Sequence, residues 1–188
     1  MNERCRLFTV MSWNVRGLGD PEKCDLVRDA VTSAMPLICC LQETKLPDIT
    51  TLKARCFLPT NLANSFKLIS AAGSRGGILT AWNDNSFSLK SFITRQHSLT
   101  TILQSTATDV QIMITNVYAP SDHRDSHLFL EGLLELSTHV SDAWLVVGDF
   151  NLVRSASDKN NGLVSRSLCN AFNDARSRPS LALNSVEL

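Results

Sequence analysis

The sequence predicts an α/β fold in a single domain. A strand, a helix and a second strand follow one another before residue 42. Five strand-like runs then occupy residues 66–117, and an amphipathic helix leads into a last apolar strand at residues 145–147. No internal repeat, low-complexity segment or linker divides the 188 residues, so one domain of ordinary size is expected.

The composition is that of a globular chain with no excess of either charge. Hydrophobic residues make up 44% and charged residues 19%, which excludes a disordered chain. Lysine plus arginine equals aspartate plus glutamate at 18 each, so any contact with nucleic acid has to come from local arginines. No segment approaches the length of a membrane span, and we expect no membrane partner.

The six cysteines form no C-x-x-C pair and no zinc-ligand spacing. They stand at positions 5, 24, 39, 40, 56 and 169. We also find no secretory leader after Met1. Reduced, buried thiols in an intracellular protein are therefore expected, with the nucleus as one candidate compartment.

A strand–helix–strand unit opens the chain. Leu7–Val15 is rich in β-branched and aromatic residues, as strands are. Asp20-Pro21 is typical of a helix start, and apolar residues at helical spacing continue to Met35. Leu37–Leu41 is a short apolar run typical of a strand covered on both faces. Such a unit favours a parallel pair of strands joined by a right-handed crossover, so the residues that follow the two strands meet at one edge of the sheet.

The middle of the chain changes from helix to strands. Residues 48–57 predict a short helix, and the runs beyond it, separated by turn signals, predict an antiparallel meander. These runs are Phe66–Ala71, Gly77–Trp82, Ser86–Thr94, Leu99–Ser105 and Val110–Val117. A single Arg75-Gly76-Gly77 beside a strand predicts a hairpin turn or bulge rather than an RNA-binding box.

The last third of the chain contains a helix, a strand and a weaker pattern. The helix carries four leucines at helical spacing, Leu130, Leu133, Leu134 and Leu136, and the strand is Leu145–Val147. Apolar residues between 168 and 175 keep helical spacing and predict one more helix. Residues 178–188 show no period and are expected to form an irregular tail after a domain of residues 1–177.

Polar side chains end four of the predicted strands. They are Asn14, Glu43, Asn116 with Tyr118, and Asp149 with Asn151. Positions i and i+2 of an extended segment face one side, so Asp149 and Asn151 would aim at one point. Oxygen donors without Cys/His pairing favour Mg²⁺, or Mn²⁺, over zinc. The alternative is that Gly148-Asp149 and Asn151 are ordinary turn residues.

Such a site would hydrolyse phosphoesters by positioning and charge stabilisation. Glu43 would be the anionic metal ligand, and Asn14 would help to fix the metal or its waters. Asp149 would orient and deprotonate an attacking water. Asn151 and Tyr118 would donate hydrogen bonds to a phosphoryl oxygen.

Four motifs occur in a recognisable order: Trp13-Asn14-Val15-Arg16-Gly17, Gln42-Glu43-Thr44-Lys45, Asn116-Val117-Tyr118-Ala119-Pro120 and Gly148-Asp149-Phe150-Asn151. In order and approximate spacing the sequence resembles the endonuclease/exonuclease/phosphatase superfamily. The stretches W-N-V-R-G-L-G, S-R-G-G-I and G-D-F-N-L-V-R-S-A-S-D-K-N-N-G further resemble the endonuclease domain of plant LINE-type (non-LTR) retrotransposons. The resemblance covers roughly residues 7–175.

The resemblance implies a four-layered α/β sandwich and Mg²⁺-dependent cleavage of phosphodiester bonds. In the retroelement branch the partner is DNA, bound by its phosphate backbone and nicked at a target site. Asn14 and Glu43 match the metal-site positions, and Tyr118 matches the tyrosine near the scissile phosphate. Asp149 matches the residue that activates the water, and Asn151 the asparagine that stabilises the transition state.

The sequence departs from the family pattern after Asn151. The family's domain continues to a late aspartate and a closing Ser-Asp-His motif, and none follows here. Ser121-Asp122-His123 precedes G-D-F-N and is interpreted as a coincidence. The chain therefore resembles the N-terminal two-thirds of the domain, C-terminally truncated, with an incomplete second sheet and an exposed strand edge.

Three functions follow from this pattern. The first is a Mg²⁺-dependent phosphodiester hydrolase of the DNA endonuclease type, expected to bind Mg²⁺ with little or no turnover, since a misplacement of about 1 Å can cost roughly 10²-fold in rate. The second is a catalytically inactive retroelement remnant. The third is a phosphatase of the same superfamily that acts on inositol phosphates or lipids.

Overall fold

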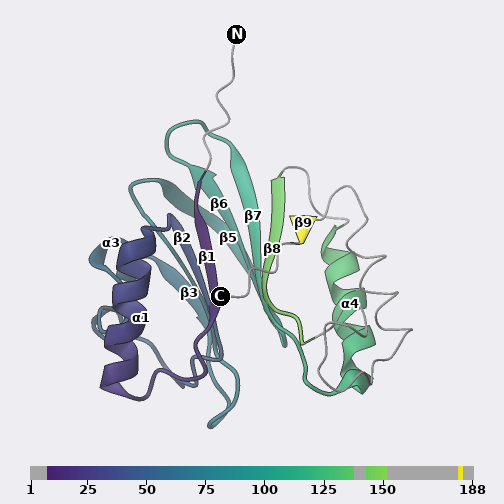
Figure 1. Cartoon of the computed structure of the whole chain (residues 1–188). Coiled ribbons are helices and arrows are strands. Elements are labelled where there is room, and N and C mark those ends of the chain that lie inside the picture. The colour runs from purple at the N-terminus through teal and green to yellow at the C-terminus, as the bar shows by residue number, and fades with distance from the viewer. Residues whose placement is uncertain (1–7, 138–142, 152–181, 184–188) are drawn as a thin grey trace.

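The computed structural model describes residues 8–137, 143–151 and 182–183 of the chain. Two β-sheets lie face to face, with helix α1 on the outer side of one and helix α4 on the outer side of the other (Figure 1). This arrangement is the four-layered α/β sandwich that the resemblance implies. None of the helices in these ranges is long and apolar enough to cross a membrane.

The first sheet has four strands in the order β1-β2-β4-β3. Their bounds are Val10–Asn14 (β1), Ile38–Gln42 (β2), Phe66–Ile69 (β3) and Ile78–Trp82 (β4). β1 and β2 are parallel, as the strand–helix–strand pattern predicts, and β4 runs antiparallel to both of its neighbours. The turn between β3 and β4 contains Arg75-Gly76-Gly77, which confirms the hairpin expected there.

Helix α1 (Pro21–Ala34) begins and ends where the sequence predicts. The side chain of Asp20 accepts a hydrogen bond from the N–H of Glu22, which satisfies a free donor of the first turn. At the other end Met35 is left-handed, with φ 45°, and its N–H donates to the carbonyl of Val31. The helix therefore has a hydrogen-bonded cap at each end.

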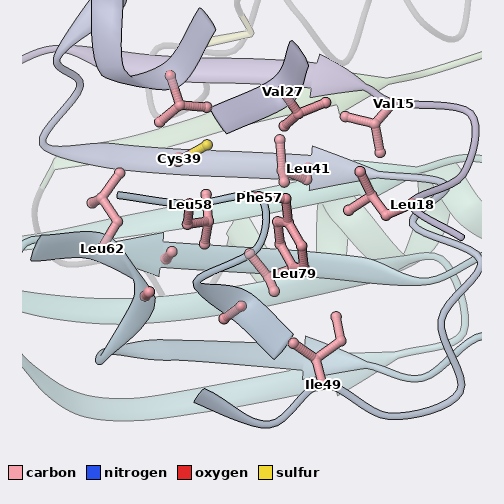
Figure 2. Close-up of a cluster of buried hydrophobic side chains, with 14 of the residues drawn as sticks. Val15, Leu18, Val27, Cys39, Leu41, Ile49, Phe57, Leu58, Leu62 and Leu79 are labelled. Carbon is pink, nitrogen blue, oxygen red and sulfur yellow. The ribbon is translucent and has the colours of Figure 1, made fainter. Parts of the chain in front are cut away.

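Successive side chains of β2 point to opposite faces of the first sheet. Cys39 and Leu41 pack towards the helix, whereas Ile38 and Cys40 face the second sheet. Figure 2 shows Val27 of α1 over Cys39 and Leu41, with Phe57 beside Leu79. Both faces of β2 are thus buried in apolar surroundings, as its uninterrupted apolar run predicts.

Two short helices cover the rest of this face, where the sequence predicts one. They are α2 (Thr51–Ala54) and α3 (Thr60–Ala63). Pro59 lies between them as the N-cap of α3, so a single helix cannot run through this segment. The helices contribute Ala54, Leu62 and Ala63 to the core, and the link between them contributes Phe57 and Leu58.

The second sheet has the order β5-β6-β7-β8-β9. Its strands are Phe87–Arg95 (β5), Ser98–Ser105 (β6), Gln111–Tyr118 (β7), Ala143–Asp149 (β8) and Ala182–Leu183 (β9). The prediction of one antiparallel meander over residues 66–117 is therefore wrong at one point: β4 and β5 lie in different sheets. β4 already pairs with β2 and β3 on its two sides, so it has no free edge for β5.

Helix α4 (His123–Ser137) connects β7 to β8, which are parallel. Its buried side chains include Phe129, Leu130 and Leu133, and they pack on Val117 and Trp144 of the sheet. This confirms the predicted amphipathic helix. It also gives the sandwich a second strand–helix–strand unit that faces the first (Figure 1).

Residues beyond β8 are described at few positions. Ala182 and Leu183 pair with Leu145 and Val146 of β8, where the sequence predicts an irregular tail. A pairing of two residues is too short to leave a periodic signal. The helix predicted between residues 168 and 175 lies outside the described residues, as do the strands needed to judge whether the second sheet is complete.

Three of the four described cysteines are buried free thiols, as the sequence predicts, whereas the fourth, Cys56, is exposed. The buried ones are Cys24, Cys39 and Cys40. Burial raises the pKa of the Cys40 thiol to about 12 and raises that of Cys39 further. Both groups are therefore protonated at neutral pH and act as small apolar side chains of the core.

Candidate active site

Two strand ends from different sheets are hydrogen-bonded to each other. The side-chain N–H of Asn14, at the end of β1, donates to Oδ2 of Asp149, at the end of β8, over 2.8 Å. The two residues stand 135 positions apart, and β1 and β8 are neighbours across the sandwich. The parallel pairs β1–β2 and β7–β8 thus bring their carboxyl ends to a common edge.

The carboxylate of Asp149 is fixed by two donors. Asn14 holds Oδ2, and the backbone N–H of Asn151 donates to Oδ1 over 3.0 Å. Hydrogen bonds to a charged acceptor are about twice as strong as those between neutral groups. The half-buried carboxylate is therefore held in one orientation before any substrate arrives.

Gly148 allows β8 to approach β7 immediately before this aspartate. Its φ is +132°, and a Cβ at this position would overlap the backbone nitrogen and carbonyl of Val117. The pairing of Tyr118 with Asp149 follows directly in the register. Only glycine therefore permits the close pairing that sets Asp149 beside Tyr118.

Asn151 reaches the site differently from the prediction. Its backbone is left-handed, with φ 47°, so the extended geometry that would put Asp149 and Asn151 on one face does not hold. The segment instead forms a turn in which Asp149 accepts from the N–H of Asn151. The side chain of Asn151 donates to the carbonyl of Ala119 over 2.7 Å. Phe150 between them is buried, as expected.

Glu43 and Lys45 form an ion pair just beyond β2. The distance from Nζ of Lys45 to Oε1 of Glu43 is 3.1 Å, and the glutamate side chain is 19% exposed. Two backbone hydrogen bonds hold the loop, from Thr44 to the carbonyl of Gly77 and from Lys45 to that of Gly76. The lysine was not among the predicted site residues, although it closes the Gln-Glu-Thr-Lys motif.

Backbone strain gathers at this edge of the molecule. Six described residues other than glycine have left-handed φ, and four of them follow the strands that end here. The four are Arg16, Glu43, Lys45 and Asn151. Conformations of this kind cost about 1–3 kcal/mol each and persist where the surrounding structure enforces them, which is common in active sites.

Tyr118 lies within the electrostatic reach of both acidic residues. Burial raises the pKa of its phenol above 10.0, and the charges of Glu43 and Asp149 raise it further. Its carbonyl oxygen lies 3.2 Å from Nδ1 of His97, at the tip of the β5–β6 hairpin. Sequence reasoning missed this histidine, whose only signal was its place in the hairpin that precedes β6.

The ionisation of Tyr118 can be measured directly because it is the only tyrosine in the chain. We expect ultraviolet difference spectroscopy to give a pKa above the ordinary value of 10.0. Replacing Glu43 by glutamine should lower that pKa, because one of the two charges that oppose phenolate formation is removed. If the pKa of Tyr118 does not change with this substitution, Glu43 does not lie in the same site as Tyr118.

Asn116 does not lie at the site edge, which corrects its grouping with Tyr118. It is fully buried, and its side chain crosses to the first sheet. There Gln42, which is 1% exposed, donates to its Oδ1. Strand alternation places Asn116 on the same face as Tyr118, but two residues deeper in the sandwich.

The donors at this edge fit a hard divalent cation. Glu43, Asp149 and Asn14 offer only oxygen ligands, which Mg²⁺ and Mn²⁺ prefer. No group of three or more His, Cys, Asp or Glu side chains gathers anywhere in the part of the chain that is described. Few protein ligands suit Mg²⁺, because this ion usually keeps several of its waters.

Comparison with known proteins agrees with the fold. Residues 11–183 match a family model described as Endonuclease/Exonuclease/phosphatase family. The AP endonuclease LMAP of Leishmania major superposes with a TM-score of 0.63 at 17% identity, over 93% of this chain and 71% of that one. The human Nocturnin catalytic domain gives 0.59 at 15% identity, over 88% and 68%. D. rerio TDP2, complexed with single strand DNA product, gives 0.56 at 16% identity, over 85% and 66%.

Proposed function

This chain belongs to the endonuclease/exonuclease/phosphatase family, and from that premise we propose that it hydrolyses phosphodiester bonds with a divalent metal ion. The observation that carries the proposal is the hydrogen bond between Asn14 and Asp149. It joins two of the four family motifs across the two sheets.

The roles of the side chains follow from their contacts. Asp149, whose two oxygens are oriented by Asn14 and by the backbone of Asn151, takes the proton of the attacking water. Tyr118 is a neutral phenol at physiological pH, a state that its raised pKa favours further, and it donates a hydrogen bond to a phosphoryl oxygen. The side chain of Asn151 leaves the carbonyl of Ala119 and donates a second hydrogen bond to a phosphoryl oxygen.

Glu43 and Asn14 are the residues that would hold Mg²⁺ or Mn²⁺. When bound, the ion supplies positive charge that offsets the phosphate anion. Lys45 already pairs with Glu43, so this carboxylate lies next to a cation in the structure. We propose that the Lys45 side chain leaves Glu43 when the metal binds and turns towards the phosphate.

DNA is the substrate that the surroundings of the site favour. Arg16 and Arg75 are exposed and lie in the loops that flank Lys45. A Cβ on Gly17 would stand 3.3 Å from the Lys45 side chain, and Gly76 accepts from the Lys45 backbone. The two arginines therefore flank one site and suit the phosphate backbone of DNA.

We expect the substitutions Arg16→Gln and Arg75→Gln each to weaken DNA binding and to reduce the salt dependence of the affinity by about one unit of log–log slope. Fluorescence anisotropy with a labelled duplex over a range of salt concentrations measures both. Lys90→Gln is the matched control, since Lys90 is exposed on β5, away from these loops. An equal effect of all three substitutions would show non-specific attraction only.

A substrate panel tests the proposed function. Purified residues 1–188 should nick supercoiled plasmid slowly with Mg²⁺ or Mn²⁺, in keeping with the low turnover expected from the sequence, and should lose the activity in EDTA. The same protein should leave inositol phosphates and other phosphomonoesters unchanged. Release of phosphate from monoesters alone would favour the phosphatase alternative, and no hydrolysis of any substrate would favour the inactive remnant.

A further inference from the structure

Two amide side chains meet in the apolar space between the sheets. Gln42 of β2 is 1% exposed and Asn116 of β7 is 0% exposed. Nε2 of Gln42 donates to Oδ1 of Asn116 over 2.6 Å, a contact that joins the first sheet to the second. Apolar side chains such as Ile38, Cys40 and Ile114 pack in this layer, beside the buried hydroxyl of Thr80, to which Asn116 also donates.

The pair is part of a larger network that includes both sheets. Gln42 also donates to Oγ of Ser12 and to the carbonyl of Cys40, at 3.1 and 3.2 Å. Asn116 donates to the carbonyl of Leu79, on β4, over 2.9 Å. No buried side-chain nitrogen or oxygen of the described residues lacks a hydrogen-bond partner.

The position of the pair relates it to the candidate active site. Gln42 immediately precedes Glu43, and Asn116 stands two residues before Tyr118. The hydrogen bond of Asn14 to Asp149 joins the same two sheets at the edge. The sheets are thus connected by directional contacts at two depths, one inside the sandwich and one at the site.

Hydrogen bonds between the sheets resist a sliding movement that apolar contacts would permit. Apolar burial is non-directional, so Ile38 or Ile114 would tolerate a small sliding of one sheet over the other. A hydrogen bond weakens steeply once its distance or angle departs from the optimum. The amide pair therefore fixes the position of the two sheets relative to each other.

We propose that Gln42 and Asn116 are positioning residues of the active site, whose amide pair holds Glu43 on the first sheet in register with Tyr118 and Asp149 on the second. The inference rests on the proposed hydrolytic function. It assigns the pair no contact with substrate or metal. Its effect on the reaction passes through the side chains that follow it in each strand.

A positioning role and a stabilising role can be told apart by removing the amide pair and measuring both stability and rate. Replacing both partners of a buried hydrogen bond by apolar groups of similar size is often nearly neutral for stability. A misplacement of catalytic groups by about 1 Å, in contrast, can cost roughly 10²-fold in rate. Removal of the pair should therefore leave a folded protein with a poorly aligned site.

The double substitution Gln42→Leu with Asn116→Leu tests the proposal. We expect the variant to fold with a lower thermal unfolding temperature, because Ser12 and the carbonyl of Leu79 each lose a hydrogen bond. We expect kcat for plasmid nicking to fall by about 10–10²-fold, with KM little changed. The pKa of Tyr118, read from its ultraviolet titration, should move towards 10.0 as Glu43 loses its alignment. Wild-type kcat and an unshifted Tyr118 pKa in the folded variant would overturn the proposal.

Thr100→Val is the matched control. The Thr100 hydroxyl is fully buried and bonds to that of Thr115 over 2.9 Å, within the second sheet. Its loss removes a buried hydrogen bond without affecting any contact between the sheets. We expect kcat and the Tyr118 titration to stay at their wild-type values, and a loss of kcat equal to that of the leucine variant would contradict the positioning role.

A swapped pair provides the rescue. Gln42→Asn with Asn116→Gln conserves both amides and their combined length, and should recover kcat and the Tyr118 pKa relative to the leucine variant. If the leucine variant does not fold, Gln42→Met tests the positioning role instead, again by kcat for plasmid nicking and by the pKa of Tyr118. If the wild-type chain hydrolyses no substrate, the proposed function fails, whereas the Tyr118 titration still tests the alignment by itself.

Discussion

Replacing Asp149 by asparagine is expected to lower metal-dependent phosphodiester hydrolysis by about 10²–10⁴-fold, the usual contribution of a general base. An amide cannot take the proton of the attacking water. The oxygen of the new side chain can still accept from Asn14, but its amino group would face the N–H of Asn151. Initial rates of plasmid nicking at saturating Mg²⁺ measure the loss.

Asp125→Asn is the control for this substitution. Asp125 is an exposed aspartate in the first turn of α4, so the same change of charge there should leave the rate within about twofold. Thermal unfolding of both variants shows whether the fold is kept. Equal nicking by wild type and Asp149→Asn would remove Asp149 from the chemistry.

Replacing Gly148 by alanine is expected to lower the free energy of unfolding by about 2–6 kcal/mol. A non-glycine residue in a rarely populated backbone conformation costs about 1–3 kcal/mol. Forcing extra atoms into a packed site costs a further 1–3 kcal/mol or so. Both apply here, because φ is +132° and the added Cβ would overlap the backbone of Val117. Urea unfolding followed by tryptophan fluorescence measures the change.

Gly19→Ala is the control for the backbone effect. Gly19 lies in the loop before α1, and a Cβ there meets nothing within 4 Å. Its substitution should change stability by no more than about 1 kcal/mol, through the entropy of the unfolded chain. Should the two alanine variants prove equally stable, the close approach of β8 to β7 would not depend on glycine.

The parts of the fold that depend on local patterns could be predicted from the sequence. Asp20-Pro21 marks the start of α1 and Met35 its end, and both are set by hydrogen bonds within a few residues. The apolar run of β2 and the leucines of α4 also predict their own burial. The parallel pairing of β1 with β2 follows from the helix that connects the two strands.

The division of the strands between two sheets could not be predicted in this way. β4 and β5 follow each other as strands of a meander would, and no residue between them shows that the chain changes sheet. The decision depends on β2, whose free edge accepts β4. Such long-range pairings leave no trace in the residues that join the strands.

The candidate site shows the same distinction. Parallel topology predicts that Asn14 and Asp149 each lie at a sheet edge, but the approach of the two sheets, which makes them bond, is a property of the whole sandwich. The burial of Asn116 depends on its partner Gln42, 74 residues away in the sequence. The sequence leaves Gly148-Asp149-Phe150-Asn151 open between an extended segment and a turn, and the left-handed backbone of Asn151 decides for the turn.

A double-mutant cycle on plasmid nicking tests most directly whether these strand ends form one catalytic site. The variants are Asn14→Ala, Asp149→Asn and the two together. Residues that act as a unit show strongly non-additive losses. We therefore expect the double variant to lose no more activity than Asp149→Asn alone. A loss equal to the product of the two single losses would show that Asn14 and Asp149 act independently, and would contradict a common site.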